Sequence, residues 1–169
     1  PPPPKVTIKF ITIEWPRVWA RLNSIFIRGE FFNVYFRILH DIYPNRKRLF
    51  RIGVHPTGIC PECRRCEDNI HKFTDCSNSR PVWTFVRFLI NYVSDDLLSN
   101  VTDSDFLFLN FPTTMFEKDI LFILFCFVNY IHKQNESREK PTVRAFSGFL
   151  KLKLFRENLY FFPNLRRIL

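Results

Sequence analysis

The sequence predicts an all-α domain of about five to six helices, interrupted by a short segment rich in cysteine and histidine. Over most of the chain, hydrophobic residues recur at intervals of three and four, which is the spacing of an amphipathic helix. Glycine occurs only four times in 169 residues. Because tight β-hairpin turns favour glycine, so few of them argue against a β-sheet domain.

Two regions are expected along the chain. Residues 1–14 combine four prolines with an alternating stretch that has no partner strand, and they predict a proline-rich linker and an extended arm. Residues 15–169 predict a single helical domain, since a content of 46% hydrophobic residues is sufficient for one core. The proline-rich start leads us to expect that the chain is a piece of a longer protein.

Three helices are expected before the Cys/His-rich segment, over residues 15–26, 31–42 and 45–53. The first carries tryptophan and aliphatic residues at helical spacing. Tyr43 and Pro44 end the second helix, and Gly53 is a suitable end for the third.

Three further helices are expected after that segment, over residues 78–93, 115–133 and 143–162. The middle of the second is apolar on all sides, which predicts a central position in the domain. Residues 94–112 are acidic and favour turns, except that residues 106–109 form a short apolar stretch that we expect to lie in a groove.

The most informative motif has the spacing C-x₂-C-x₇-H-x₄-C and consists of Cys60, Cys63, His71 and Cys76. Three thiolates and one imidazole fill the four positions of a tetrahedral zinc ion and leave none open for a catalytic water. Free or disulfide-bonded cysteines are the alternative, but five cysteines are an odd number and no secretory signal is recognisable. The expected cofactor is a structural zinc ion, held by a knuckle over residues 58–76.

Cys66 leaves a second ligand assignment open, because Cys63 and Cys66 also have C-x₂-C spacing. If Cys66 bound the metal together with Cys63, the charged Arg64 and Arg65 would closely flank the ion. We therefore prefer Cys60 and Cys63 as the first ligand pair.

Positive charge is concentrated around this motif in a chain whose net charge is +9. The residues predicted to contact RNA or DNA are Arg46, Lys47, Arg48, Arg51, Arg64 and Arg65. A basic surface of this kind contacts phosphates with little sequence preference. The alternative is that these side chains are ordinary solvated surface residues.

No catalytic residue is predicted, since the sequence has no glycine-rich phosphate loop and no Ser/His/Asp pattern. The aspartates at positions 95, 96, 103 and 105 lie in a segment where helix capping and solvation account for them. No apolar stretch reaches the roughly 18–20 residues that a membrane span needs. We expect an intracellular protein, nuclear or cytoplasmic, without a membrane partner.

The region from residue 15 to residue 83 resembles the zinc-binding region near the C-terminal end of LINE-type, non-LTR retrotransposon reverse transcriptases. The four predicted ligands carry this resemblance together with Trp15, Pro16, Arg17, Val18, Trp19, Phe36, Arg37, Ile38, Leu39, His40, Tyr43, Pro44, Asn45, Arg46, Arg48, Leu49, Ile52, Gly53, Glu67, Arg80 and Trp83. Two departures affect the expected geometry of the knuckle loop: Arg64 replaces a frequent glycine, and Cys66 is an additional cysteine.

The resemblance implies a non-catalytic module of a retrotransposon polyprotein, or a domesticated derivative, that grips template RNA or target DNA during target-primed reverse transcription. Its partners would be nucleic acid and the other domains of the parent polyprotein. The active-site motif of a reverse transcriptase is absent from the chain. The alternative hypothesis is a protein–protein interaction domain that derives from such an element and has been co-opted by the host.

Overall fold

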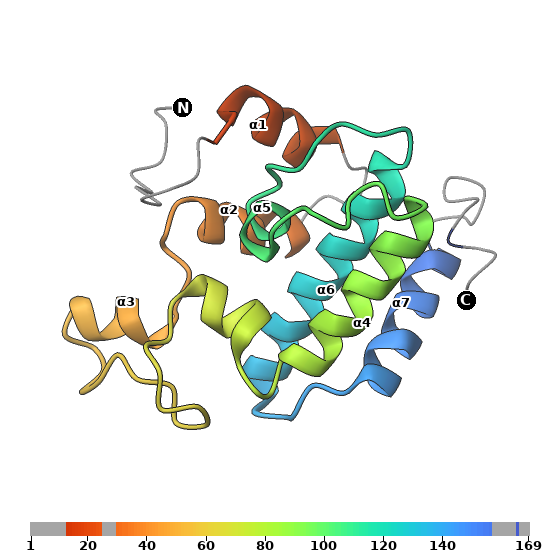
Figure 1. Ribbon diagram of the computed structural model, residues 1–169. Coiled ribbons are helices and arrows are strands. Elements are labelled where there is room, and N and C mark those ends of the chain that lie inside the picture. The colour runs from red at the N-terminus through yellow and green to blue at the C-terminus, as the bar shows by residue number, and fades with distance from the viewer. Residues whose placement is uncertain (1–12, 25–29, 157–164, 166–169) are drawn as a thin grey trace.

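The computed structural model describes residues 13–24, 30–156 and 165 of the chain. These residues form seven α-helices and one π-helix, with no strand among them, so the predicted all-α class is confirmed (Figure 1). Most of the proline-rich linker and extended arm predicted over residues 1–14 lies outside the described residues.

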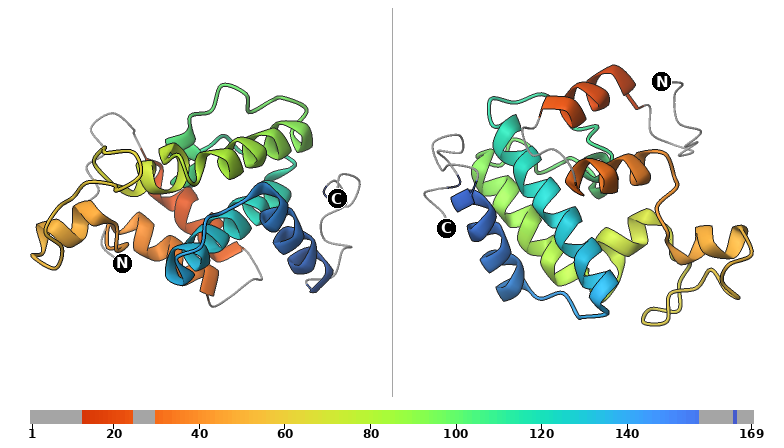
Figure 2. Two further views of the ribbon diagram at one scale, coloured as in Figure 1. Left: turned by 90° about the horizontal axis from the view of Figure 1, so that it is seen from below. Right: turned by 180° about the vertical axis from the view of Figure 1, so that it is seen from behind.

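Helix α6 (Glu117–Ser137) is the centre of the fold. Every residue from 119 to 131 is buried, which confirms the prediction of a central helix that is apolar on all sides. It packs against α2 (Glu30–Leu39), α4 (Arg80–Val93) and α7 (Val143–Arg156). Figures 1 and 2 show α4, α6 and α7 running side by side, with α2 crossing α6 from another direction.

Helix α1 (Trp15–Ser24) packs on this body through Val18 and Leu22, and one buried arginine, Arg21, adds polar contacts. Its Nη1 donates hydrogen bonds to the carbonyl oxygens of Leu109 and Phe111 at 2.8 and 2.6 Å. Its Nη2 forms an ion pair of 2.7 Å with Oε2 of Glu117, in the first turn of α6. The guanidinium also lies over the Phe111 ring, 4.0 Å from its centroid. Arg21 therefore links α1 to the start of the central helix.

The structure contains two short helices that were not among the expected ones. Helix α5 (Asp103–Leu107) begins at Thr102, whose side-chain oxygen accepts a hydrogen bond from the Asp105 backbone N–H at 3.1 Å. The two aspartates of its first turn favour a helix start because they face the positive end of the helix dipole. The apolar stretch predicted over residues 106–109 is fully buried, as expected. The second addition is the π-helix η1 (His71–Asp75).

Helix α3 (Arg46–Arg51) and the loop that follows it project from the helical body in all three ribbon views (Figures 1 and 2). We refer to residues 46–66 as the α3 lobe. Only one residue of this lobe, Cys60, is buried. The lobe therefore has no hydrophobic core of its own.

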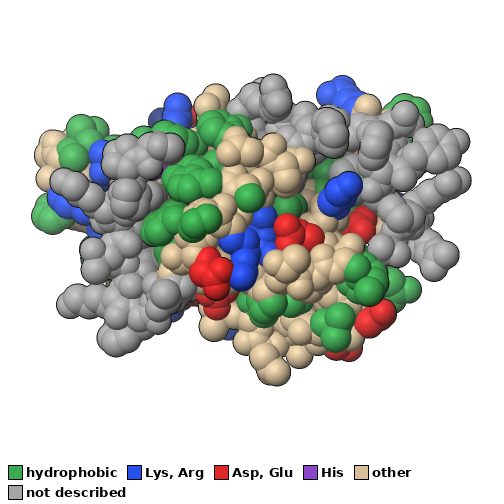
Figure 3. All heavy atoms as spheres, turned by 90° about the horizontal axis from the view of Figure 1, so that it is seen from above, with side chains coloured by type: hydrophobic (Ala, Val, Ile, Leu, Met, Phe, Trp, Pro, Cys, Tyr) green, Lys and Arg blue, Asp and Glu red, His purple; other side chains and the backbone are tan. Residues whose placement is uncertain are grey.

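Basic and acidic side chains are intermixed on the face of the body seen in Figure 3. They lie next to one another near the centre of this face, bordered by hydrophobic side chains. None of the helices in the described part of the chain is both long and apolar enough to cross a membrane.

Replacing Arg21 by Met should lower the free energy of unfolding by about 3 kcal/mol, because two buried carbonyl groups and Glu117 lose their partner. Urea denaturation measures this loss. Arg17→Met is the matched control, since the Arg17–Glu14 ion pair is exposed, with side chains 38% and 57% accessible. The control should change stability by less than about 1 kcal/mol. Equal losses in the two variants would contradict the assigned role of Arg21.

Candidate metal centre

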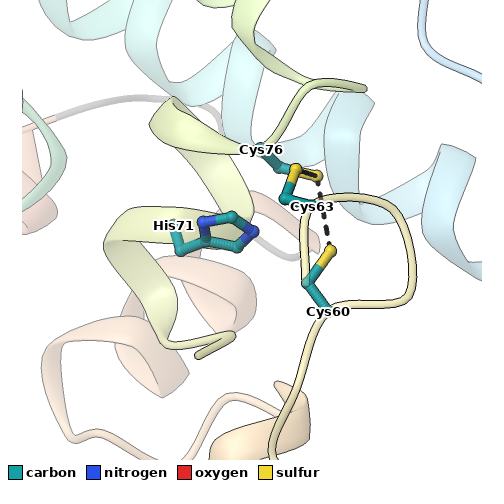
Figure 4. Close-up of side chains that lie close together, drawn as sticks. All are labelled: Cys60, Cys63, His71 and Cys76. Carbon is teal, nitrogen blue, oxygen red and sulfur yellow. Dashed lines mark hydrogen bonds between the residues drawn. The ribbon is translucent and has the colours of Figure 1, made fainter. Parts of the chain in front are cut away.

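The four predicted ligands come together from two segments of the chain. Cys60 and Cys63 lie in the loop of the α3 lobe, whereas His71 begins η1 and Cys76 follows its last residue. Their ligand atoms all lie within 4.8 Å of one another (Figure 4). These four residues can therefore hold a metal ion.

The distances between the sulfur atoms fit a shared ion. Sγ of Cys76 lies 3.8 Å from Sγ of Cys60 and 3.8 Å from Sγ of Cys63. A disulfide bond would need about 2.05 Å, and none of the five cysteines forms one. Metal–sulfur bonds of about 2.3 Å in tetrahedral geometry place two sulfur ligands about 3.8 Å apart. The three thiols are thus already spaced as ligands of one tetrahedral ion.

His71 supplies the fourth donor. The residue is buried, and its Nε2 atom has no hydrogen-bond partner within the described residues. Figure 4 shows the ring directed toward the loop that carries Cys60 and Cys63. A buried ring nitrogen without a partner is costly, and coordination of a metal would satisfy it. The donor set is therefore three sulfur atoms and one nitrogen.

A tight turn brings Cys60 and Cys63 to the same point. The Cys60 N–H donates to the Arg65 carbonyl at 2.8 Å, and the Arg64 N–H donates to the Cys60 carbonyl at 3.0 Å. Ile59 and Cys66 form an antiparallel bridge across this turn. Arg64 closes it with a φ of 58°, a left-handed conformation that costs a side chain other than glycine about 1 kcal/mol.

The π-helical turn of η1 brings His71 and Cys76 close together. The Cys76 N–H donates to the His71 carbonyl at 2.7 Å, so one hydrogen bond joins the backbones of two ligands that are five positions apart. Single π-helical turns are frequent at functional sites. Phe73 is fully buried and packs on Tyr43, with ring centroids 5.1 Å apart, which fixes η1 against the body. The x₄ spacing between His71 and Cys76 is the only sequence signal of this turn.

Local groups tune the protonation of the ligands. The Ser77 backbone N–H, which donates to Sγ of Cys63 at 3.1 Å, lowers the pKa of that thiol, and the Ser77 hydroxyl adds to the effect. Burial raises the pKa of the Cys76 thiol to about 12. Burial, and then the charge of Arg65, lower the pKa of His71 and favour the neutral imidazole that binds metals. Sequence analysis missed Ser77, which carries no motif signal.

Cys66 lies outside the cluster. Its side chain is exposed, whereas Cys60 is buried beside Cys76. The geometry groups Cys60, not Cys66, with the other three ligands.

The six predicted nucleic-acid contacts divide into inner and outer side chains. Arg46 is half-buried: its Nη1 bonds to Nε2 of His55 at 2.9 Å, and its Nε lies 3.8 Å from Oε2 of Glu67. Arg48 donates to the Asp41 carbonyl at 2.9 Å. These two arginines connect the α3 lobe to the segments on either side of it. The exposed side chains are Lys47, Arg51, Arg64 and Arg65.

Comparison with known proteins yields no match among family models, curated proteins or solved structures. A function for the chain therefore has to be inferred from the chemistry of the cluster and from the charges around it.

Cys66→Ser should leave metal binding unchanged, whereas Cys63→Ser should weaken it more than the roughly 10–100-fold typical of residues that only support a ligand. Titration with Co²⁺ measures this, because a tetrahedral thiolate site gives visible ligand-field and charge-transfer bands. Loss of these bands in Cys66→Ser would show that Cys66 is a ligand.

Proposed function

We propose that the chain is a zinc-stabilised, non-catalytic nucleic-acid-binding module of a LINE-type retrotransposon reverse transcriptase, or a domesticated derivative of one. The observation that carries this proposal is the position of the Cys/His cluster, which joins the projecting, basic α3 lobe to the helical body. The proposed ligands of zinc are Cys60, Cys63, His71 and Cys76. The proposed contacts with RNA or target DNA are the exposed cations of the lobe.

Zinc is the metal that this donor set favours. Three thiolates and an imidazole in tetrahedral arrangement are typical of zinc, whereas hard ions such as Mg²⁺ and Ca²⁺ prefer oxygen donors. Four protein ligands leave no coordination position for water or substrate, so the ion would be structural. Because the α3 lobe buries only Cys60, metal–ligand bonds would supply the free energy that its side chains do not.

The charge of the α3 lobe supports the nucleic-acid proposal. Residues 46–66 carry six Lys or Arg side chains and a single carboxylate, Glu62. By contrast, basic and acidic side chains lie next to one another on the face of the body in Figure 3. A projecting segment with one sign of charge favours contact with a polyanion, in which phosphate contacts give affinity that falls with salt.

Residues that the chain shares with LINE-type sequences have definite structural roles, and this supports the resemblance. Oε1 of Glu67 accepts hydrogen bonds from the Arg46 N–H at 3.0 Å and from Nζ of Lys72 at 3.2 Å, which fixes the start of α3. Trp83 is buried against Phe127, with ring centroids 5.1 Å apart. Arg64 has a positive φ where those sequences often carry glycine, the residue that adopts this conformation at least cost.

Protein–protein interaction is the second candidate, and exposed hydrophobic side chains on the body favour it. These lie on α4 and α7 and are Phe88, Tyr92, Leu152 and Phe155. A patch of this kind is a possible docking surface. A partner that binds this face while the α3 lobe binds no nucleic acid would favour the second candidate.

Chelation should disorder the α3 lobe while the body stays folded. In excess chelator, amide hydrogen exchange should increase over residues 46–66, because the lobe loses its metal bonds and has no core. The amides of α6 serve as an internal control and should stay protected. Metal analysis of the untreated protein should give zinc. Unchanged exchange over the lobe after complete zinc removal would contradict the structural role of the ion.

Neutralising three exposed cations should weaken nucleic-acid binding and its salt dependence. The variant Lys47→Gln/Arg51→Gln/Arg64→Asn should lower the slope of log affinity against log salt by about 2–3, since each lost phosphate contact removes about 0.7–0.9. Asparagine is chosen at position 64 because it tolerates a positive φ.

A mobility-shift titration at several salt concentrations measures this change. The control removes the same charge from the body through Lys118→Gln, Lys140→Gln and Arg144→Gln, all exposed. If the control weakens binding as much as the lobe variant, the contact surface has been assigned to the wrong part of the protein.

A further inference from the structure

The α3 lobe exposes an aromatic ring that the fold does not use. Phe50 is 55% accessible on a helix that buries no residue at all. Ile52 and Val54 follow at 53% and 69% accessibility, so the end of the helix and the turn after it form a small apolar tip. Single exposed hydrophobic residues are common, but a contiguous group on a projecting segment indicates contact with a ligand.

Two cations flank this ring. Lys47 precedes Phe50 by one helical turn and Arg51 follows it directly, so both side chains extend from the same short helix. Their carboxylate partners are weakly held: Nζ of Lys47 lies 3.7 Å from Asp68, and Nη2 of Arg51 lies 3.3 Å from Asp41. All four side chains of these two pairs are more than 40% exposed. Exposed pairs of this kind contribute at most about 1 kcal/mol, so phosphates can replace the carboxylates.

The backbone of the helix that carries this ring is fixed relative to the metal centre. A Cβ atom at Gly58 would lie 3.3 Å from Cα of Lys47 and 3.7 Å from Cβ of Phe50, so the backbone that leads to Cys60 packs directly beneath both residues. The Lys47 N–H donates to the Glu67 carbonyl at 3.1 Å. Helix α3 therefore packs on the two chain segments that enter and leave the turn containing Cys60 and Cys63.

From these contacts we propose that Phe50 is a base-stacking site for single-stranded nucleic acid, with Lys47 and Arg51 contacting the phosphates on either side. This inference rests on the proposed nucleic-acid-binding function and identifies the form of nucleic acid and the point of contact. An aromatic platform combined with cations is how proteins bind single strands without reading their sequence. Paired bases inside a duplex do not present a free face to such a ring.

A protein or membrane partner fits this tip less well. A stable protein interface buries about 800 Å² on each partner, which needs far more than three hydrophobic side chains. The six-residue helix is too short to lie in a membrane surface as an amphipathic helix. The excess of cations over carboxylates in the lobe instead complements a phosphate backbone.

The test compares Phe50→Ala with Phe88→Ala, which removes a ring of matched exposure, 58%, from the helical body. Fluorescence anisotropy measures the affinity of the zinc-loaded protein for a labelled oligouridine and for a duplex of the same length. Phe50→Ala should weaken single-strand binding by about 5- to 100-fold, the range expected for one stacked base. Duplex affinity and the salt slope should stay unchanged, as no phosphate contact is lost. Phe88→Ala should match the wild type.

A second variant, Phe50→Trp, keeps the stacking surface. It should retain the affinity, and its added indole fluorescence should be quenched when oligouridine binds. The Co²⁺ spectrum of each variant verifies that the metal centre is intact.

Wild-type affinity of Phe50→Ala for oligouridine would overturn the stacking site and leave nucleic-acid binding by the cations in place. An equal loss on single strands and on duplex would also overturn it, because the ring would then not distinguish free from paired bases. A wild-type protein that binds neither ligand would overturn both this inference and the proposed function.

Discussion

The burial of α6 on all sides is the constraint from which the rest of the structure follows. A helix with no polar face must be covered in every direction, and α2, α4 and α7 provide that cover. Helix α4 extends from this contact back to Arg80, four residues after Cys76, and η1 packs on α4. Two of the four ligands, His71 and Cys76, therefore sit on a frame that the hydrophobic core holds in place.

The other two ligands have no such support. The α3 lobe that carries Cys60 and Cys63 is joined to the body by polar contacts, such as the hydrogen bonds from the Arg46 N–H to Oε1 of Glu67 at 3.0 Å and from Arg48 to the Asp41 carbonyl at 2.9 Å. Net contributions of single hydrogen bonds are about 1 kcal/mol, which is small against the entropy of ordering a loop. Under the zinc proposal, metal binding and the ordering of the lobe are thus one coupled equilibrium. One half of the site would then be preformed, and the other half would fold onto it when the metal binds.

The sequence predicts what depends on local pattern and misses what depends on distant partners. The periodic helices and the ligand spacing were visible because each is encoded within a few residues. The role of Arg21 was not, because its partner Glu117 lies 96 positions away and the arginine itself belongs to an ordinary amphipathic helix. The π-helical turn and the positive φ of Arg64 left only weak signals in the sequence, the x₄ spacing and the position where similar sequences often have glycine.

Sequence alone also overestimates the number of basic side chains that the lobe can offer to phosphates. Sequence alone counts six basic residues in the lobe, but Arg46 and Arg48 are engaged with His55, Glu67 and the Asp41 carbonyl. Four exposed cations remain, and about 0.7–0.9 of salt slope per phosphate contact limits the electrostatic part of the affinity to a slope of roughly 3–4. Under the nucleic-acid proposal, a module with so few contacts would bind weakly alone. As part of a longer nucleic-acid-binding protein, it would gain from a high effective concentration, which would make such a weak contact sufficient.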